Sequence, residues 1–286
     1  MIITLAPPQN ITSIDLGASN PKLGGVVNVT GFANLTTLIG DNNDISDFIL
    51  SDANDQLEYI DFNNNLLTGS GNQYMPPNVE VIKLLENALD EPLTDLSGFT
   101  QLRYIDCGFN LNMGGSIPSL PTSIVVCDLI MSGMSGNIPS LNGLTKLERY
   151  RVTYNSLTGT IPIVSGSPLL NNFQVHDNQL TGNIPDFSNC TNMYIFDVDN
   201  NQLTGYVGGA VSTNIFRLNW QNNLLPASAV NTILSECVAS GVSGPAPGVS
   251  GQNRIINVGG NAAPTGQGLI DAQTLRDRNW SVTVAA

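Results

Sequence analysis

The sequence predicts a β-rich solenoid, in which short repeated units stack on one parallel sheet, and three observations lead to this prediction. An apolar pattern recurs at steps of 22 to 24 residues from Ile11 to Ile215. Within each copy, an alternating pair of apolar residues is typical of a half-buried strand. An asparagine follows most of these pairs at a fixed distance. Because one such unit cannot bury its apolar side alone, neighbouring units must stack and share a core.

The copies align on their first apolar residue. Ten regular copies begin at Ile11, Leu35, Leu57, Val79, Leu102, Ile124, Leu147, Leu170, Met193 and Ile215. A degenerate copy, NRIINVGGN, begins at Asn253. The copy LERYRVTYNSLTGTIP, which ends at Pro162, shows the full pattern LxxLxLxxNxLTGxIP. Tandem copies at near-constant spacing are very unlikely by chance, so the repeat determines the expected fold.

This pattern resembles the leucine-rich repeat, in the Thr-Gly-x-Ile-Pro form of plant-type and some bacterial or phage surface proteins. The resemblance implies a right-handed superhelix with a concave parallel β-sheet, an irregular convex side and few helices. It also implies that the asparagine points inward and bonds backbone groups of adjacent turns, which is a structural role. The asparagine ladder comprises Asn43, Asn65, Asn87, Asn110, Asn155, Asn178, Asn201, Asn223 and Asn261, with Ser132 replacing it once.

The repeats favour a single solenoid domain over residues 1–286, although length alone would suggest two domains. Residues 1–34 are the expected N-terminal cap and first repeat, residues 35–225 the regular repeats, and residues 226–286 the C-terminal cap. That cap is expected to contain a helix over 227–239, a Gly/Ser/Pro loop over 241–251, the degenerate repeat, a short helix over 269–277 and a strand over 280–284. Terminal repeats are atypical because they must seal the core from water.

Composition excludes several classes of function. With 10 basic and 23 acidic residues the net charge is -13, which argues against nucleic acid or an anionic membrane as partner, since both need clustered Lys and Arg. No apolar run is long enough to span a membrane, and the start of the chain lacks the regions of a signal peptide. The four cysteines do not pair convincingly, so free buried thiols are expected. No metal-ligand motif or phosphate-binding loop occurs in the sequence, so neither a cofactor nor a metal is expected.

Stacked parallel strands turn each outward repeat position into a column of side chains. The central column contains Asp15, Ile39, Asp61, Lys83, Asp106, Asp128, Arg151, Gln174, Asp197 and Asn219. Its carboxylates are interrupted by basic residues, which favours a solvated charge ladder, and exposed pairs of this kind contribute little stability. Two alternatives stay open, namely part of a partner footprint and a divalent ion near Asp106 and Asp128.

The neighbouring column places Thr153, His176 and Asp199 in one row, which superficially copies a hydroxyl–histidine–carboxylate triad. An open sheet face and the lack of a glycine-rich nucleophile turn argue against catalysis. We interpret the row as a surface His–Asp contact and expect no catalytic residue. A hydrolase that uses these three residues is the least favoured hypothesis.

The third column, together with its neighbours, predicts an exposed apolar patch in repeats three to six that is rimmed by charge. Tyrosine and arginine are residues that commonly anchor contact surfaces. The predicted binding residues are Tyr59, Val81, Leu85, Tyr104, Asp106, Val126, Asp128, Ile130, Arg149 and Arg151.

The functional hypothesis is a non-enzymatic module that recognises a protein or a glycan through the concave face. Low lysine content and abundant Asn, Gly, Ser and Thr suit display on a phage virion, as a decoration or tail-associated protein. They equally suit a bacterial surface, and both locations are favoured over the cytoplasm. The alternative is a purely structural protein whose patch is buried against a neighbouring subunit.

Overall fold

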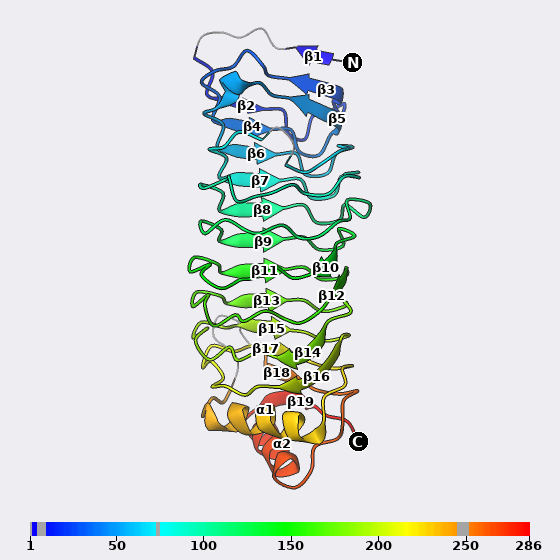
Figure 1. Cartoon of the computed structure of the whole chain (residues 1–286), viewed down its shortest axis with the longest axis vertical. Helices are drawn as coiled ribbons and strands as arrows, with labels where there is room; N and C mark the ends of the chain where they lie inside the picture. Colours follow the sequence, from blue (N-terminus) through cyan, green and yellow to red (C-terminus); the bar gives the residue numbers. More distant parts are fainter. Residues whose placement is uncertain (1, 5–9, 73–74, 245–251) are drawn as a thin grey trace. The chain divides into compact units, whose positions relative to one another are not determined.

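A computed structural model describes residues 2–4, 10–72, 75–244 and 252–286. The chain divides into two compact units, Met1–Ser135 and Gly136–Ala286. Each unit is a parallel β-solenoid in which every turn of the repeat adds one short strand to a sheet (Figure 1). The proposed single domain over the whole chain stays a prediction.

The sheet of the first unit takes one three-residue strand from each turn. Its strands are β2 (Ser13–Asp15), β4 (Thr37–Ile39), β6 (Tyr59–Asp61), β7 (Val81–Lys83), β8 (Tyr104–Asp106) and β9 (Val126–Asp128). They pair in parallel register, so Lys83 lies between Asp61 and Asp106 on the adjacent strands. The middle residue of each strand points into the core, where Ile60 and Ile82 are completely buried. This register matches the predicted columns of side chains.

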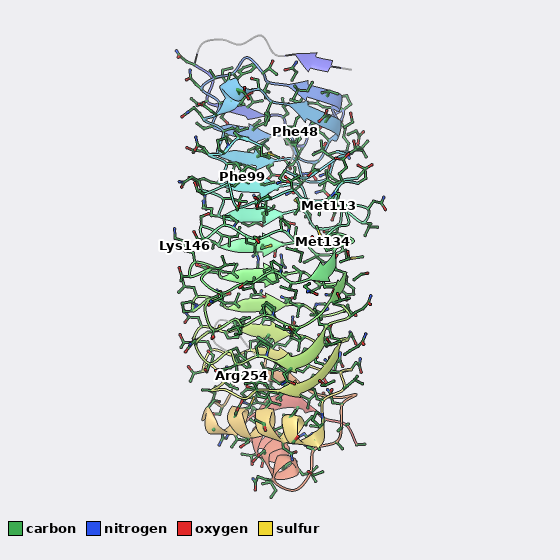
Figure 2. The ribbon with its side chains drawn as sticks, in the orientation of Figure 1. Phe48, Phe99, Met113, Met134, Lys146 and Arg254 are labelled. Atoms are coloured by element: carbon green, nitrogen blue, oxygen red, sulfur yellow. The ribbon has the colours of Figure 1, made fainter. Side chains whose placement is uncertain are left out.

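The return path of the first turns also contains strands. These are β1 (Ile2–Thr4), β3 (Gly24–Asn28) and β5 (Asp44–Ile49), followed by the one-turn 3-10 helix η1 (Asp52–Asn54). Phe48 of β5, which is labelled in Figure 2, stacks on Phe62, which follows β6, with 4.7 Å between ring centroids. The sequence predicts an irregular path here, and the structure differs because extended segments stacked at the repeat spacing can pair their backbone groups.

The second unit repeats this arrangement. Its sheet contains β11 (Arg149–Arg151), β13 (Asn172–Gln174), β15 (Ile195–Asp197), β17 (Arg217–Asn219), β18 (Arg254–Asn257) and β19 (Trp280–Thr283). Its return path contains β12 (Ser156–Thr158), β14 (Thr181–Ile184) and β16 (Gln202–Tyr206), and β10 (Ser135–Asn137) begins on the last residue of the first unit. Stacked rings fill the core, with Phe196 5.1 Å from Phe173 and 4.7 Å from Phe187.

Two helices belong to the end of the second unit (Figure 1). Helix α1 (Ala227–Ala239) has the predicted bounds, and α2 (Gln267–Asp277) begins slightly before the predicted start. The degenerate repeat supplies β18, which pairs with both β17 and β19. Its buried Arg254, which is labelled in Figure 2, donates to the carbonyl of Ile215, and its guanidinium lies 6.0 Å from the centre of the Trp280 ring. This side chain therefore ties the last strands to the regular repeats.

Each turn bends at the residue immediately before the ladder asparagine, and that residue has a positive φ. The residues at this position are Asn42, Asn64, Glu86, Phe109, Met131, Tyr154, Asp177, Asn200, Asn222 and Gly260. The asparagine side chain then pairs the backbone groups at the bend. Asn65, for example, donates to the Gly40 carbonyl of the preceding turn at 2.8 Å and accepts from the Ile45 N–H at 2.9 Å. At Ser132 a hydroxyl instead donates to the Cys107 carbonyl at 2.9 Å.

All four cysteines are free and buried, as the sequence predicts. Burial raises the pKa of the Cys190 thiol to about 11, and the nearby Asp186 adds to the shift. In the N-terminal cap, residues 1 and 5–9 lie outside the described residues, as do residues 245–251 of the predicted loop. Over the described ranges, none of the helices has the length and apolar character needed to cross a bilayer.

Candidate functional site

The outer face of the first unit's sheet is formed by the side chains that point away from its core. At its centre, Tyr59, Asp61, Lys83 and Tyr104 form what we call the tyrosine–lysine cluster. Lys83 Nζ donates to the Tyr59 hydroxyl at 2.6 Å and pairs with Asp61 Oδ2 at 3.3 Å. The same ammonium lies 5.0 Å from the centre of the Tyr59 ring and 5.8 Å from that of Tyr104. Strand register explains the cluster, because β6, β7 and β8 are consecutive neighbours.

Electrostatics keep the lysine of this cluster charged. Burial lowers the pKa of Lys83, but the hydrogen bond to Tyr59 and the negative charge of Asp61 together raise it above its ordinary value. The Tyr59 hydroxyl also donates to Asp61 Oδ2 at 3.1 Å. Both rings are half-buried, so the cluster presents two positioned aromatic surfaces beside a neutralised charge pair. Aromatic side chains held in this way lose little conformational entropy when a ligand binds.

An apolar strip formed by Leu85 and Ile130 lies beside the cluster. Both side chains are half-buried, and Gly108 occupies the equivalent position of the turn between them. A Cβ at Gly108 would lie 3.1 Å from Leu85 Cδ1 and 3.4 Å from the Ile130 carbonyl oxygen. The glycine therefore allows the leucine side chain to lie across the turn that follows β8.

Two of the predicted binding residues are buried in the structure, although the sequence predicts that they are exposed. Val81 is only 5% exposed and Asp128 only 1% exposed, so neither offers the accessible surface that its column position suggests. Val81 is short and lies between the two tyrosines of the cluster on the adjacent strands, which accounts for its burial. Asp106 and Val126 are half-buried on the outer face.

The two predicted arginines belong to the second unit. Arg149 and Arg151 are both half-buried on β11. The charge ladder predicted for the central column is seen at Lys83 and Asp61 in the first unit. In the second unit, Asp197 is 2% exposed and accepts two hydrogen bonds from Arg217 Nε, at 2.9 and 3.0 Å.

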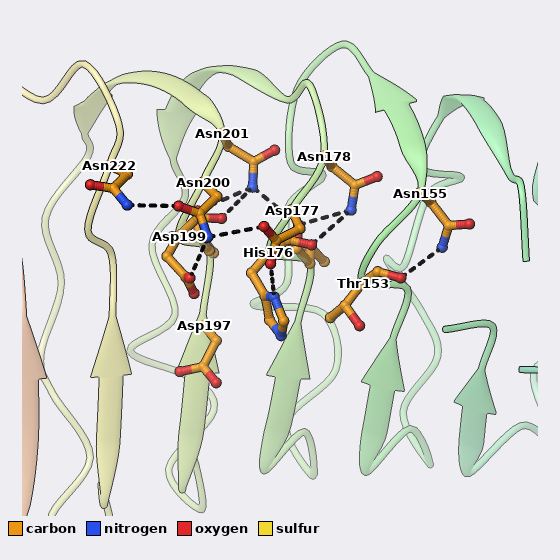
Figure 3. A network of polar contacts seen from close by, with 12 residues as sticks. Thr153, Asn155, His176, Asp177, Asn178, Asp197, Asp199, Asn200, Asn201 and Asn222 are labelled. Atoms are coloured by element: carbon orange, nitrogen blue, oxygen red, sulfur yellow. Dashed lines mark hydrogen bonds and ion pairs between the residues drawn. The ribbon is translucent and has the colours of Figure 1, made fainter. Parts of the chain in front are cut away.

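The predicted row of Thr153, His176 and Asp199 has a different geometry from a triad (Figure 3). His176 Nδ1 lies 2.7 Å from Oδ2 of the adjacent Asp177, so Nδ1 of the ring pairs with Asp177 and not with Asp199. Thr153 is 2% and Asp199 5% exposed, although their column positions predict that both lie on an open face. Short side chains in stacked turns are covered by the neighbouring turns on each side, which explains the difference.

His176, Asp177 and Asp199 together form what we call the histidine–aspartate cluster, in which one donor atom from each residue lies within 4.8 Å of the others. Asn200 Nδ2 bridges the two carboxylates, donating to Asp177 Oδ1 and Asp199 Oδ2 at 3.0 Å each. Burial raises the pKa of Asp199 to about 6; the positive charge of His176 opposes the shift and the negative charge of Asp197 adds to it.

Sequence reasoning missed Asp177 and Asn200 as members of this group. Both occupy the left-handed position before a ladder asparagine, which the outward columns did not include. That position recurs once in each turn, so its residues form a further column along the bend. Within this column Asp177 contacts Asn200, which in turn contacts Asn222.

No protein-family model matches the sequence, and no curated protein is significantly similar to it. Among solved structures, it resembles the plant peptide hormone receptor RGFR1 in complex with RGF2, with 27% identity, a TM-score of 0.61, and coverage of 75% of this chain and 37% of the receptor. A TDR receptor matches with 16% identity and a TM-score of 0.63 over 96% of this chain and 55% of the receptor. A leucine-rich-repeat protein of Leptospira interrogans matches with 16% identity and a TM-score of 0.53 over 88% of this chain and 72% of that protein.

The chain spans between about a third and about a half of the length of the two receptors. The matches below 25% identity bear on the fold alone. They agree with the three features established independently from the residues, which are the LxxLxLxxNxL repeat, the parallel sheet with one strand in each turn, and the asparagine ladder. The chain therefore has the leucine-rich-repeat fold, a parallel β-solenoid with one strand of the sheet in each turn.

Proposed function

We propose that the outer face of the first unit binds a protein segment, and that the protein acts by binding and not by catalysis. The tyrosine–lysine cluster is the observation that carries this proposal. It combines two half-buried rings, a positioned charge pair and the adjacent apolar strip of Leu85 and Ile130. Interfaces are commonly anchored by aromatic residues of this kind. The complex of RGFR1 with RGF2 supports a peptide ligand by analogy.

Charge favours a basic segment as the ligand. The outer face of the first unit displays the carboxylates of Asp15 and Asp106 around the cluster, and the chain carries a net charge of -13. A negative surface accelerates association with a positive partner and disfavours acidic ones. Binding should therefore weaken as the salt concentration rises.

Burial in the second unit supports binding over catalysis. Thr153, the candidate nucleophile of the predicted row, is 2% exposed, so its hydroxyl is not presented to a substrate. A hydrolase activity that the His176→Ala substitution abolishes would contradict the proposal.

The binding test compares the wild type with a Tyr59→Ala/Tyr104→Ala double variant. Both are screened against a library of displayed random peptides and against a glycan array, and the best ligand is then titrated by calorimetry. We expect the library to yield basic peptides whose affinity falls at least about tenfold in the double variant. Tyr154→Ala in the second unit is the matched control, because this tyrosine is 53% exposed and lies outside the cluster.

Three results would contradict a peptide ligand. Peptides that bind the wild type and the double variant equally would place the contact elsewhere. Glycan ligands without peptide ligands would assign the face to carbohydrate. A change in oligomeric state of the double variant, measured by light scattering, would instead favour the structural role in which the face is buried in an assembly.

We further propose that the module is displayed on a phage virion or a bacterial surface. Low lysine content and abundant Asn, Gly, Ser and Thr support this location. Protease treatment of intact particles and intact cells tests it, because a displayed module is digested without lysis. Protection in both samples would contradict the proposal.

A further inference from the structure

The histidine–aspartate cluster joins two consecutive turns of the second unit. His176 and Asp177 follow β13, and Asp199 follows β15 (Figure 3). One nitrogen and two carboxylate oxygens, one from each residue, lie within 4.8 Å of one another. A mixed set of imidazole nitrogen and carboxylate oxygen suits divalent transition metals, whereas Ca²⁺ and Mg²⁺ prefer oxygen ligands alone.

Neutral amides hold the two carboxylates of the cluster together. Asn200 Nδ2 donates to one oxygen of Asp177 and one of Asp199. Asn222 Nδ2 donates to Asn200 Oδ1 at 2.8 Å and so fixes which end of that amide faces the carboxylates. A neutral amide offsets little of the repulsion between two negative groups. Arg217, a basic residue of the same unit, is already paired with Asp197.

Asp199 supplies a second and independent observation. The residue is 5% exposed, and its Oδ1 is buried without a hydrogen-bond partner. Its other oxygen accepts from Asn200, so the carboxylate is oriented but only half satisfied. A buried polar atom without a partner is costly. A cation bound to this oxygen would remove that cost and offset the negative charge of the cluster.

We propose that the histidine–aspartate cluster binds a divalent transition-metal ion, represented by Zn²⁺, through His176 Nδ1, Asp177 Oδ2 and Asp199 Oδ1. The ion takes the place of the proton between Nδ1 and Asp177 Oδ2. These atoms are 2.7 Å apart, whereas tetrahedral ligands on metal bonds of about 2.1 Å are roughly 3.4 Å apart, so a small rotation of the two side chains admits the ion. Rotation of the Asp199 side chain brings the third ligand to the ion, and water completes the coordination.

The bound ion would link the turn after β13 to the turn after β15. A ligand that binds only the native state stabilises it in proportion to the logarithm of ligand concentration. Metal binding at this site would therefore stabilise the contact between the repeats that contain β13 and β15. It lies in the second unit and does not depend on the peptide-binding face proposed for the first unit.

Calorimetry tests the site directly. ZnCl₂ is titrated into metal-free wild-type protein at pH 7.5, with CaCl₂ in a parallel experiment. We expect one Zn²⁺ per chain with a Kd below about 10 μM and at least about tenfold weaker binding of Ca²⁺. His176→Gln and Asp199→Asn should each weaken Zn²⁺ binding at least about tenfold. Asp277→Asn is the control, since this carboxylate is exposed on α2.

Nuclear magnetic resonance provides a readout specific to this ligand, because His176 is the single histidine of the chain. Zn²⁺ should shift its imidazole signals with saturation at one equivalent, whereas metal bound elsewhere would leave them unchanged. Saturable Zn²⁺ binding with unchanged imidazole signals would overturn the proposal. So would wild-type affinity in His176→Gln or Asp199→Asn, or absence of binding to wild-type protein that is shown to be folded by circular dichroism.

Discussion

At the residue scale, one asparagine in each turn meets the hydrogen-bonding needs of a sharp bend. Asn178 shows the arrangement within the second unit. Its amide donates to the Val152 carbonyl of the preceding turn at 3.0 Å and to the Val175 carbonyl of its own turn at 3.1 Å, and it accepts from the Leu157 N–H at 2.9 Å. A side chain with both donors and an acceptor, and of this length, is required at a buried position of this kind.

Replacing Asn178 with alanine should therefore be costly. The substitution leaves the buried Leu157 N–H without an acceptor, whereas the Val152 and Val175 carbonyls keep the bonds that they accept from Asn155 and Asn201. We expect a loss of about 1–3 kcal/mol in the free energy of unfolding. Denaturant unfolding followed by circular dichroism measures the loss. Asn112→Ala, at an exposed position, is the control and should change stability by less than about 0.5 kcal/mol. Equal effects of the two substitutions would argue against the structural role of the ladder.

The bend also shows a residue-scale feature that the repeat pattern does not reveal. The position before the asparagine is left-handed even where it holds Phe109, Met131 or Tyr154, although bulky residues seldom adopt positive φ. The stacked neighbours impose this conformation, because each turn must match the path of the next. Asp177 and Asn200 stand at this position and thereby help to form the histidine–aspartate cluster.

At the element scale, α1 is attached to the return path by a partly buried polar contact. The Tyr206 hydroxyl of β16 donates to Glu236 Oε2 at 2.6 Å, and the Gly209 N–H donates to Glu236 Oε1 at 2.9 Å. Burial raises the pKa of Tyr206 well above its ordinary value, and the bond to Glu236 raises it further. The helix is thus held by a neutral phenol that must keep its proton.

Stability should consequently fall at alkaline pH through Tyr206. A group whose pKa is higher in the folded state contributes fully below its unfolded pKa of about 10, and this contribution is lost as pH rises above that value. Tyr206→Phe should cost about 1–2 kcal/mol at pH 7 but should lose less stability than the wild type between pH 9 and pH 11. Thermal unfolding across this range checks both effects. The control Tyr194→Phe, whose ring stacks on Phe216, should retain the wild-type dependence on pH.

Helix α2 offers a comparison between two leucines of one element. Leu275 is completely buried, whereas Leu269 is 56% exposed. Leu275→Ala should lower the free energy of unfolding by about 2–5 kcal/mol because it removes buried methyl groups and leaves a cavity. Leu269→Ala should change it by less than about 0.5 kcal/mol. Chemical denaturation of both variants measures the difference, and a similar loss in each would contradict the packing of α2.

At the scale of the whole molecule, the last repeat of a solenoid leaves one side of its apolar core uncovered, so this side must be capped. In the second unit, β18 and β19 extend the sheet beyond β17, and α1 and α2 follow the regular repeats. Trp220 and Leu218 are completely buried at this end. A sheet edge with an uncovered apolar core tends to aggregate, so the cap should be needed for solubility.

A chain that ends at Leu225 tests this requirement. It lacks β18, β19 and both helices, which exposes the edge of β17 and the apolar side chains near it. We expect aggregation at micromolar concentration and increased binding of a hydrophobic dye, measured by light scattering and fluorescence. A chain that ends at Thr283 retains the last strand and should behave as the wild type. A monomeric, folded product from the shorter chain would show that the cap is dispensable.

Much of the fold could be predicted because a repeat constrains every copy at once. The register of Asp61, Lys83 and Asp106 followed from spacing alone, and so did the bounds of α1. The candidate face was predicted less well. Column positions placed Tyr59 and Tyr104 beside Lys83, but they did not reveal that Val81 and Asp128 are buried. Side-chain burial depends on the sizes and rotamers of neighbours in other turns, which spacing does not describe.

By itself, the sequence of this protein determined the repeat, the strand register and the inward asparagine, because each depends on a periodic pattern of side-chain types. The tertiary structure alone decided which outward residues are accessible. It also decided that Asp177 and Asp199 meet at His176, and that strands form on the return path. These features depend on the left-handed bend and on packing between stacked turns. Both arise only when segments separated by a full repeat come into contact.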